Sequence, residues 1–201
     1  MNWQPHIAWI ALTTTLPAGA GWSPLPPWQH IEEVVAQRCG ACHGSGGQGS
    51  NPMFPKLAGQ NAGYLERQMT NFQRGVRSGP VMFYQLSDMS AQDIAALARH
   101  FAGLERRPTQ ASPTGAESGA RLYSEPGSNG IKACAECHGN YGRGNDTMPS
   151  LAGQHAAYLA DQMNRFRNGK RVAGQTPEHP RASQLSEDEV TAISQYLSSL
   201  K

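Results

Sequence analysis

Two copies of one short pattern decide the fold of this chain: Cys39-Gly-Ala-Cys42-His43 and Cys134-Ala-Glu-Cys137-His138. Every cysteine of the sequence falls in one of them. Two thiols three residues apart can form thioethers with the two vinyl groups of one porphyrin, and the histidine that follows then lies under the iron. The pattern predicts two covalently bound haem c groups, attached through Cys39, Cys42, Cys134 and Cys137, with His43 and His138 as proximal iron ligands.

Other uses of Cys-x-x-Cys fit this chain poorly. A redox disulfide of the thioredoxin kind would need a βαβ context, and the sequence has no such pattern. A zinc site built from both pairs would not need a histidine directly after each second cysteine. The duplicated histidine therefore favours haem attachment.

The sequence around the two motifs is itself duplicated, with the second copy about 95 positions after the first (Cys134 against Cys39). Phe54 to Gln60 reads FPKLAGQ, and Met148 to Gln154 reads MPSLAGQ. The matching continues through Tyr64/Tyr158, Leu65/Leu159, Gln68/Gln162, Met69/Met163, Phe72/Phe166 and Gly75/Gly169. Because the stretch after residue 104 is polar and contains prolines, we expect two domains, 21–104 and 118–201, joined by a linker over 105–117.

Apolar residues recur every three or four positions in each half, which predicts an all-α fold. We expect a first helix that runs into the haem motif, a middle helix that ends near Gly75 or Gly169, and a last helix over 91–104 or 187–200. Ser90 with Asp93, and Ser186 with Glu189, have the spacing of capping boxes at the start of the last helices. Domains of this size have small cores, and a buried haem would supply the missing apolar surface.

The haem motifs, the Pro-x-Leu-Ala-Gly-Gln segments, the tyrosine and glutamine after them, and the duplication together resemble the cytochrome c4 group over residues 28–200. That resemblance implies two tandem class I cytochrome c domains, with their haems close together across a pseudo-twofold interface. It also implies a periplasmic electron carrier that serves terminal oxidases or other reductases. The backbone carbonyls of Pro55 and Pro149 then become candidates to accept the free N–H of the proximal histidines.

The resemblance places the distal ligand of each iron in the loop between the middle and last helices. In the first half this loop holds Met82, which we expect to be the ligand. Met89 is a competitor, although it directly precedes the helix cap, where an apolar packing role is usual. Met69 lies on an apolar helix face, and Met53 precedes the proline segment on the proximal side.

The corresponding loop of the second half, residues 170–185, contains no methionine. His179 stands close to the place that Met82 takes in the first half, so we expect a second imidazole on this iron. The alternatives are a surface role for His179, or coordination by Met148, Met163, His155 or Lys170.

Unequal ligands predict unequal haems, because exchanging a thioether for an imidazole removes the ligand that favours ferrous iron. We expect the second haem to accept electrons from a dehydrogenase or a quinol-oxidising complex, and the first to pass them to an oxidase or reductase. Both partners are redox proteins, with transient docking to a membrane complex as one form of contact. The competing interpretation is a haem enzyme or ligand-binding protein with an open or labile sixth site on the second iron; no residue is assigned a catalytic role.

Residues 1–20 resemble a secretory signal peptide, and haem attachment outside the bacterial cytoplasm also favours a periplasmic protein. The net charge of +2 and the isoelectric point near 8.4, without long runs of one sign, do not indicate a nucleic-acid binder. A local cluster of Arg165, Arg167, Lys170 and Arg171 fits either haem propionates or a docking face for an acidic partner.

Overall fold

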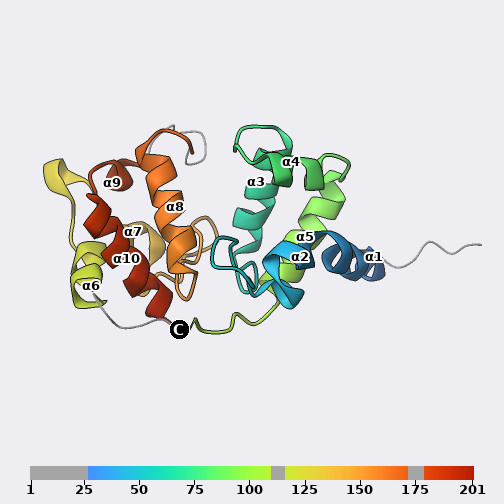
Figure 1. Cartoon of the computed structure of the whole chain (residues 1–201), viewed down its shortest axis with the longest axis horizontal. Helices are drawn as coiled ribbons and strands as arrows, with labels where there is room; N and C mark the ends of the chain where they lie inside the picture. The colour runs from blue at the N-terminus through green and yellow to red at the C-terminus, as the bar shows by residue number, and fades with distance from the viewer. Residues whose placement is uncertain (1–26, 110–115, 172–178) are drawn as a thin grey trace, which may run out of the picture.

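A computed structural model of the chain describes residues 27–109, 116–171 and 179–201, in which every regular element is a helix. Figure 1 shows two helical lobes side by side, with residues 103–109 running along one edge from the first lobe toward the second. The first lobe consists of α1 (Pro27–Val34), α2 (Gly40–His43), α3 (Ala62–Gln73), α4 (Pro80–Leu86) and α5 (Ala91–Ala102). The second consists of α6 (Ala116–Ser124), α7 (Cys134–His138), α8 (Ala156–Arg167), α9 (Pro180–Ser183) and α10 (Glu187–Ser199). The expected signal segment, residues 1–20, lies outside the described residues.

The first lobe is organised around α5, which packs against α1 and α3. The chain passes from α1 through a π-helical turn, Val35–Cys39, directly into α2, as expected for a helix that runs into the haem motif. A single cluster of buried side chains joins these helices: Ile31, Val35, Leu65, Leu97, Ala98 and Phe101. All of these side chains are apolar. They form a hydrophobic core that holds the helices around the haem motif in place.

The second lobe has the same plan, with α10 packed against α6 and α8. Close approach of α6 to α10 depends on Gly119, because a Cβ there would lie 2.2 Å from the carbonyl oxygen of Ala192. Its core consists of Tyr123, Leu159, Leu185, Val190, Ile193 and Leu197. The Tyr123 hydroxyl donates a 2.7 Å hydrogen bond to the Gly139 carbonyl, which ties α6 to the end of the haem motif.

Both expected capping boxes are confirmed. Ser90 accepts from the Asp93 N–H at 3.2 Å and Ser186 accepts from the Glu189 N–H at 3.2 Å, while each carboxylate accepts from the backbone N–H of its serine. The last helices therefore begin where the sequence predicts.

The connection between the middle and last helices differs from the open loop that the sequence suggests. In the first lobe it contains α4, a seven-residue helix with Pro80 in its first turn. In the second lobe it contains the shorter α9, which begins at Pro180. Proline suits the first helical turn because its φ is already helical and its missing N–H has no partner there. Met82 therefore lies on a helix, and His179 directly precedes one.

The two lobes meet through a reciprocal pair of glutamines from the repeated Leu-Ala-Gly-Gln segments. The Gln60 side chain accepts from the Ser150 N–H at 2.8 Å and donates to the Ser150 carbonyl at 2.9 Å. Gln154 does the same with the backbone of Lys56, at 2.9 Å in both bonds. Each glutamine thus completes the backbone hydrogen bonding of the opposite lobe, with the pseudo-twofold relation that the repeat implies.

Replacing Gln154 with alanine is expected to lower the free energy of unfolding by about 2–3 kcal/mol, because it leaves the buried backbone N–H and carbonyl of Lys56 without partners. Urea unfolding of the holoprotein measures the loss. The matched control is Gln48→Ala: Gln48 also bridges a backbone carbonyl and N–H, those of Glu105 and Arg107, but in an exposed place. In Gln48→Ala, water can replace the lost amide and the free energy of unfolding should change little. Equal decreases in the two variants would contradict the role of Gln154 in satisfying buried backbone groups.

Candidate functional site

One cavity of about 1020 Å³ extends through both lobes. Apolar side chains from both cores line it, among them Leu65, Leu97, Leu159 and Leu197. All eight residues singled out from the sequence also line it: Cys39, Cys42, His43, Met82, Cys134, Cys137, His138 and His179. The fold therefore brings both motifs and both distal candidates to a single cavity.

The two motif histidines are held in the same way. His43 Nδ1 lies 3.0 Å from the Pro55 carbonyl oxygen, and His138 Nδ1 lies 3.1 Å from that of Pro149. Because a carbonyl can only accept, Nδ1 carries the proton in each ring and Nε2 keeps its lone pair for a metal. Burial lowers the pKa of both imidazoles, and the bonds to the proline carbonyls only partly offset it. Both rings are therefore neutral at pH 7, the form that binds iron.

The four cysteines lie beside these histidines, and none of them is in a disulfide. Burial raises the pKa of the Cys39 and Cys134 thiols. After each histidine the chain turns sharply at a glycine, Gly44 with φ 76° and Gly139 with φ 78°, a conformation that favours residues without a Cβ. An apolar cavity, two thiols and an oriented neutral imidazole in each lobe fit a covalently bound haem.

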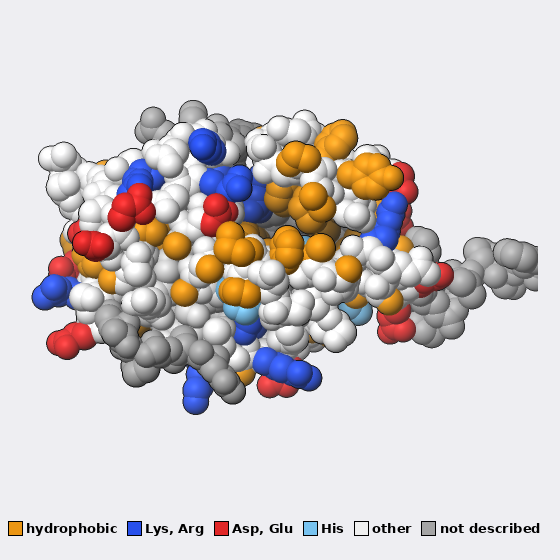
Figure 2. Space-filling view, viewed as in Figure 1, with side chains coloured by type: hydrophobic (Ala, Val, Ile, Leu, Met, Phe, Trp, Pro, Cys, Tyr) orange, Lys and Arg blue, Asp and Glu red, His pale blue; other side chains and the backbone are white. Residues whose placement is uncertain are grey.

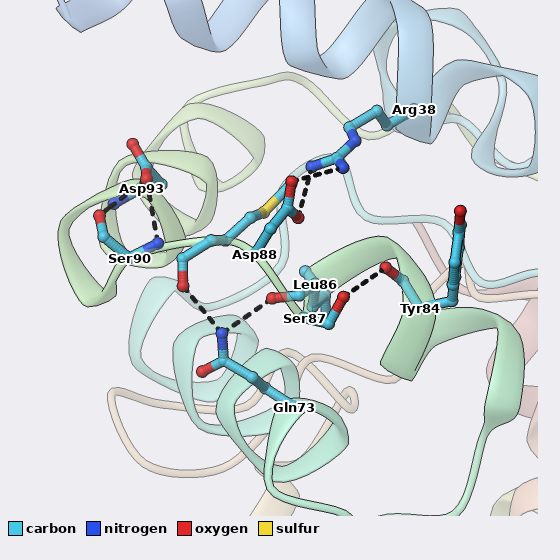
Figure 3. A network of polar contacts seen from close by, with 9 residues as sticks. Arg38, Gln73, Tyr84, Leu86, Ser87, Asp88, Ser90 and Asp93 are labelled. Atoms are coloured by element: carbon cyan, nitrogen blue, oxygen red, sulfur yellow. Dashed lines mark hydrogen bonds and ion pairs between the residues drawn. The ribbon is translucent and has the colours of Figure 1, made fainter.

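Met82 lines the cavity from α4, whose far end is firmly tied to the rest of the first lobe (Figure 3). The Gln73 amide of α3 donates to the carbonyls of Leu86 and Met89, at 2.8 Å each. Arg38 forms a bidentate ion pair with Asp88, in which its two terminal nitrogens lie 3.0 and 2.9 Å from the two carboxylate oxygens. Gln73 and Arg38 thus fix the position of the helix that carries Met82.

The other methionines of the first lobe have different surroundings. Met69 and Met89 pack against the buried core cluster, in agreement with an apolar role. Met53 is 55% exposed. These surroundings leave Met82 as the methionine best suited to a distal position.

His179 lies across the cavity from His138. Their ring centres are 6.2 Å apart and their planes differ by 14°. Two imidazoles that share a metal through nitrogens at about 2 Å each have ring centres roughly 6 Å apart, so the spacing matches an iron between them. Burial lowers the pKa of His179 to about 4, and the neighbouring His138 adds a smaller effect in the same direction. This ring is therefore neutral at pH 7 as well.

The alternatives for the second iron are placed less suitably. Met163 packs against the second core cluster, and Met148 is 36% exposed. His155 Nε2 lies 2.8 Å from the Gly49 carbonyl oxygen of the first lobe, a contact between lobes. Lys170 is exposed.

A ring of polar side chains from both lobes lines the cavity, and sequence reasoning did not identify one member of it, Arg77. Arg77 of the first lobe donates to Tyr158 and Gln162 of the second, at 3.0 and 2.8 Å. Arg171 of the second lobe donates to Tyr64 and Gln68 of the first, at 2.7 and 3.2 Å. Each arginine also donates to the glutamine of its own lobe. The repeated Gly-x-Arg at residues 75–77 and 169–171 is the signal that could have revealed the pair.

This arginine ring carries two positive charges close together. Among the described residues, all the hydrogen-bond partners of Arg77 and Arg171 are neutral. Burial alone would raise the pKa of Tyr64, but the charges of Arg171 and Arg77 lower it. The ring therefore forms a positive wall of the cavity and is suited to an anionic group.

Two other cations of the expected basic cluster have acidic partners on the second lobe. Arg165 pairs with Asp161 at 2.8 Å, and Arg167 pairs with Glu187. Only Arg171 of this cluster is buried between the lobes. Arg171 therefore differs from the rest of the cluster, because its hydrogen-bond partners include side chains of the opposite lobe.

The lobes differ on their outer faces too. Val81 and Tyr84 of α4 are 63% and 75% exposed, and Phe83 beside them is exposed as well. In Figure 2, apolar side chains gather on the first lobe where Figure 1 places α4. The corresponding α9 reads PRAS and has no large apolar side chain.

Comparison with known proteins agrees with this geometry. Residues 116–201 match the family model "Cytochrome c", and residues 26–100 match "Cytochrome C oxidase, cbb3-type, subunit III". The chain is 39% identical to cytochrome c4 of Pseudomonas aeruginosa over 173 residues, 84% of this chain and 86% of that protein. It is 35% identical over 188 residues to a thiosulfate dehydrogenase electron acceptor of Thiomonas intermedia, 90% of this chain and 83% of that protein. The crystal structure of reduced cytochrome c4 from Pseudomonas stutzeri superposes with a TM-score of 0.80 at 35% identity, over 86% of this chain and 98% of that one.

Two tandem cytochrome c domains built around one cavity define a dihaem c-type cytochrome, and the chain carries two covalent haem c groups. More particularly, it belongs to the cytochrome c4 family. It is an electron carrier rather than an enzyme.

Proposed function

We propose that the chain carries single electrons in the periplasm, from a dehydrogenase or quinol-oxidising complex to a terminal oxidase or reductase. A dehydrogenase as donor is supported by the relative named a thiosulfate dehydrogenase electron acceptor. The periplasm is supported by the need to attach c-type haem outside the cytoplasm. Among the described residues, no helix is long and apolar enough to cross a membrane.

In this proposal Cys39 and Cys42 attach the first haem, and Cys134 and Cys137 attach the second. His43 and His138 are the proximal ligands, oriented by the carbonyls of Pro55 and Pro149. When bound, the haems supply reversible one-electron exchange at iron. We assign the first haem to a domain over residues 21–104 and the second haem to a domain over residues 118–201, with residues 105–117 as the linker.

The distal ligands differ between the two irons: Met82 for the first and His179 for the second. The single observation that carries this assignment is the position of the His179 ring, 6.2 Å from the His138 ring and nearly parallel to it across the cavity. A methionine sulfur favours ferrous iron, whereas a second imidazole lowers the reduction potential. Electrons then enter at the second haem and leave from the first.

Arg77 and Arg171 bind the haem propionates at the cavity wall between the lobes. Two guanidiniums with neutral neighbours need an anion to offset their mutual repulsion, and carboxylates are the anions that the cofactors bring. Each arginine also bonds side chains of the opposite lobe, so the surroundings of the two haems are linked.

Low-temperature EPR of the oxidised holoprotein, with its far-red absorption, tests the ligand assignment. We expect one methionine-ligated haem and one bis-imidazole haem in the wild type. His179→Ala should remove the bis-imidazole signal alone, and Met82→Ala should remove the methionine band alone. A second haem that is high-spin in the wild type and unaffected by His179→Ala would refute His179 as a ligand.

A further inference from the structure

The three imidazoles that line the cavity are not held equally. His43 and His138 each place Nδ1 against a proline carbonyl, at 3.0 and 3.1 Å. His179 Nδ1 is buried as well, but no other residue that the structure describes offers it a hydrogen-bond partner, and the backbone contact that raises the pKa of this ring is with His179 itself. Within residues 27–109, 116–171 and 179–201, the distal imidazole thus lacks a carbonyl of another residue such as the one that orients each proximal ring.

The His179 ring also packs against an aromatic ring. Its centre lies 5.1 Å from that of the Phe166 ring, at an angle of 41°. The guanidinium of Arg171 lies over the same Phe166 ring, 4.6 Å from its centre. Packing against a ring limits sideways movement, but it does not fix the Nδ1–H in one direction.

The backbone of His179, in contrast, is tied down. Its carbonyl accepts from the Ala182 N–H at 2.9 Å, within the turn that begins α9. A side chain that rotates away from the iron would therefore remain close by and could return. A fixed backbone and a loosely held imidazole are the arrangement expected of a residue that can leave the iron and bind it again.

The absent hydrogen bond has a known chemical cost. A partner on the far nitrogen of a ligating histidine fixes the ring and increases its basicity, and removing such a partner lowers metal affinity about 10–100-fold. His179 should therefore bind its iron more weakly than an anchored histidine in the same place would.

We propose that His179 is a displaceable ligand, and that a small neutral diatomic molecule such as carbon monoxide takes its place on the ferrous second haem. This inference rests on the proposed assignment of His179 as the distal ligand. In the exchange, the bond from His179 Nε2 to iron breaks and a bond from the carbon of the incoming ligand forms. No electron or proton is transferred, because the imidazole leaves in its neutral form.

The test is carbon monoxide binding to the fully reduced holoprotein, followed by the Soret band in stopped flow. We expect one of the two haems to bind, at a rate that levels off at high carbon monoxide concentration because departure of His179 becomes limiting. His179→Ala should bind at the same single haem at least tenfold faster, with a rate linear in concentration. Met82→Ala is the matched control, and it should add binding at the other haem without changing the slow phase.

Two results would overturn the inference, and they differ in what they say about ligation. A wild type that binds no carbon monoxide while His179→Ala binds it at once would make His179 a tight ligand, so the ligand assignment would stand and the exchange would not. Fast, linear binding that is the same in wild type and His179→Ala would show that His179 does not hold the iron. The ligand assignment would then fail together with the inference.

Discussion

Replacing His179 with methionine is expected to raise the reduction potential of the second haem by on the order of 0.1 V and to leave the first nearly unchanged. Axial ligands set haem potentials over a range of about 0.8 V, and exchanging imidazole for thioether uses part of that range in favour of ferrous iron. At about 59 mV per tenfold change, this shift alters the equilibrium between the two haems roughly fiftyfold. A spectroelectrochemical titration that resolves both haems measures it.

The reverse substitution, Met82→His, provides the control. It should lower the potential of the first haem and leave two low-potential haems of similar value. If His179→Met moved neither potential, the difference between the lobes would not come from this ligand. The direction of electron flow proposed above would then lose its basis.

Replacing Arg171 with glutamine is expected to lower the free energy of unfolding of the holoprotein by about 3 kcal/mol, since the haem propionates that we propose as its partners would stay buried without this cation. Tyr64 and Gln68 of the opposite lobe lose a donor, and the propionates lose a cation. Removing this positive charge should also lower the potentials of both haems, because the ring contacts both lobes. Guanidinium chloride unfolding and a redox titration measure the two effects.

The matched control is Arg165→Gln, near the end of α8 and six residues before Arg171. Arg165 pairs with Asp161 at the surface, where both side chains are more than one third exposed. An exposed pair contributes less than about 1 kcal/mol. Similar losses in the two variants, or a shift confined to one haem in Arg171→Gln, would contradict the shared role of the ring.

The parts of the fold that depend on local pattern could be predicted from the sequence. The capping serines Ser90 and Ser186 mark the starts of the last helices, and the repeated apolar spacing marks the middle ones. Helix α4 could not be predicted in the same way. Val81, Phe83 and Tyr84 are largely exposed, so they form no buried apolar stripe from which a helix could be recognised.

The parts of the candidate site whose residues stand at a fixed spacing in the sequence could be predicted. The parts formed by contacts between the two lobes could not. The missing methionine directed attention to His179, and the structure places that residue opposite His138. That no other described residue offers His179 Nδ1 a hydrogen-bond partner depends on how the interior packs and leaves no trace in the sequence. Arg77 was missed because a single arginine after a glycine looks like a solvated helix end until the second lobe is in place.

The reciprocal contacts of Gln60 and Gln154 have a further consequence for the origin of the molecule. In symmetry terms they form an isologous interface, in which one surface patch meets a copy of itself. A single ancestral domain with this glutamine could have paired with a second copy through the same four hydrogen bonds, and the linker would later have made that dimer permanent. Once both copies were on one chain, each could change without the other. The difference between Met82 in the first half and His179 in the second is consistent with such separate change.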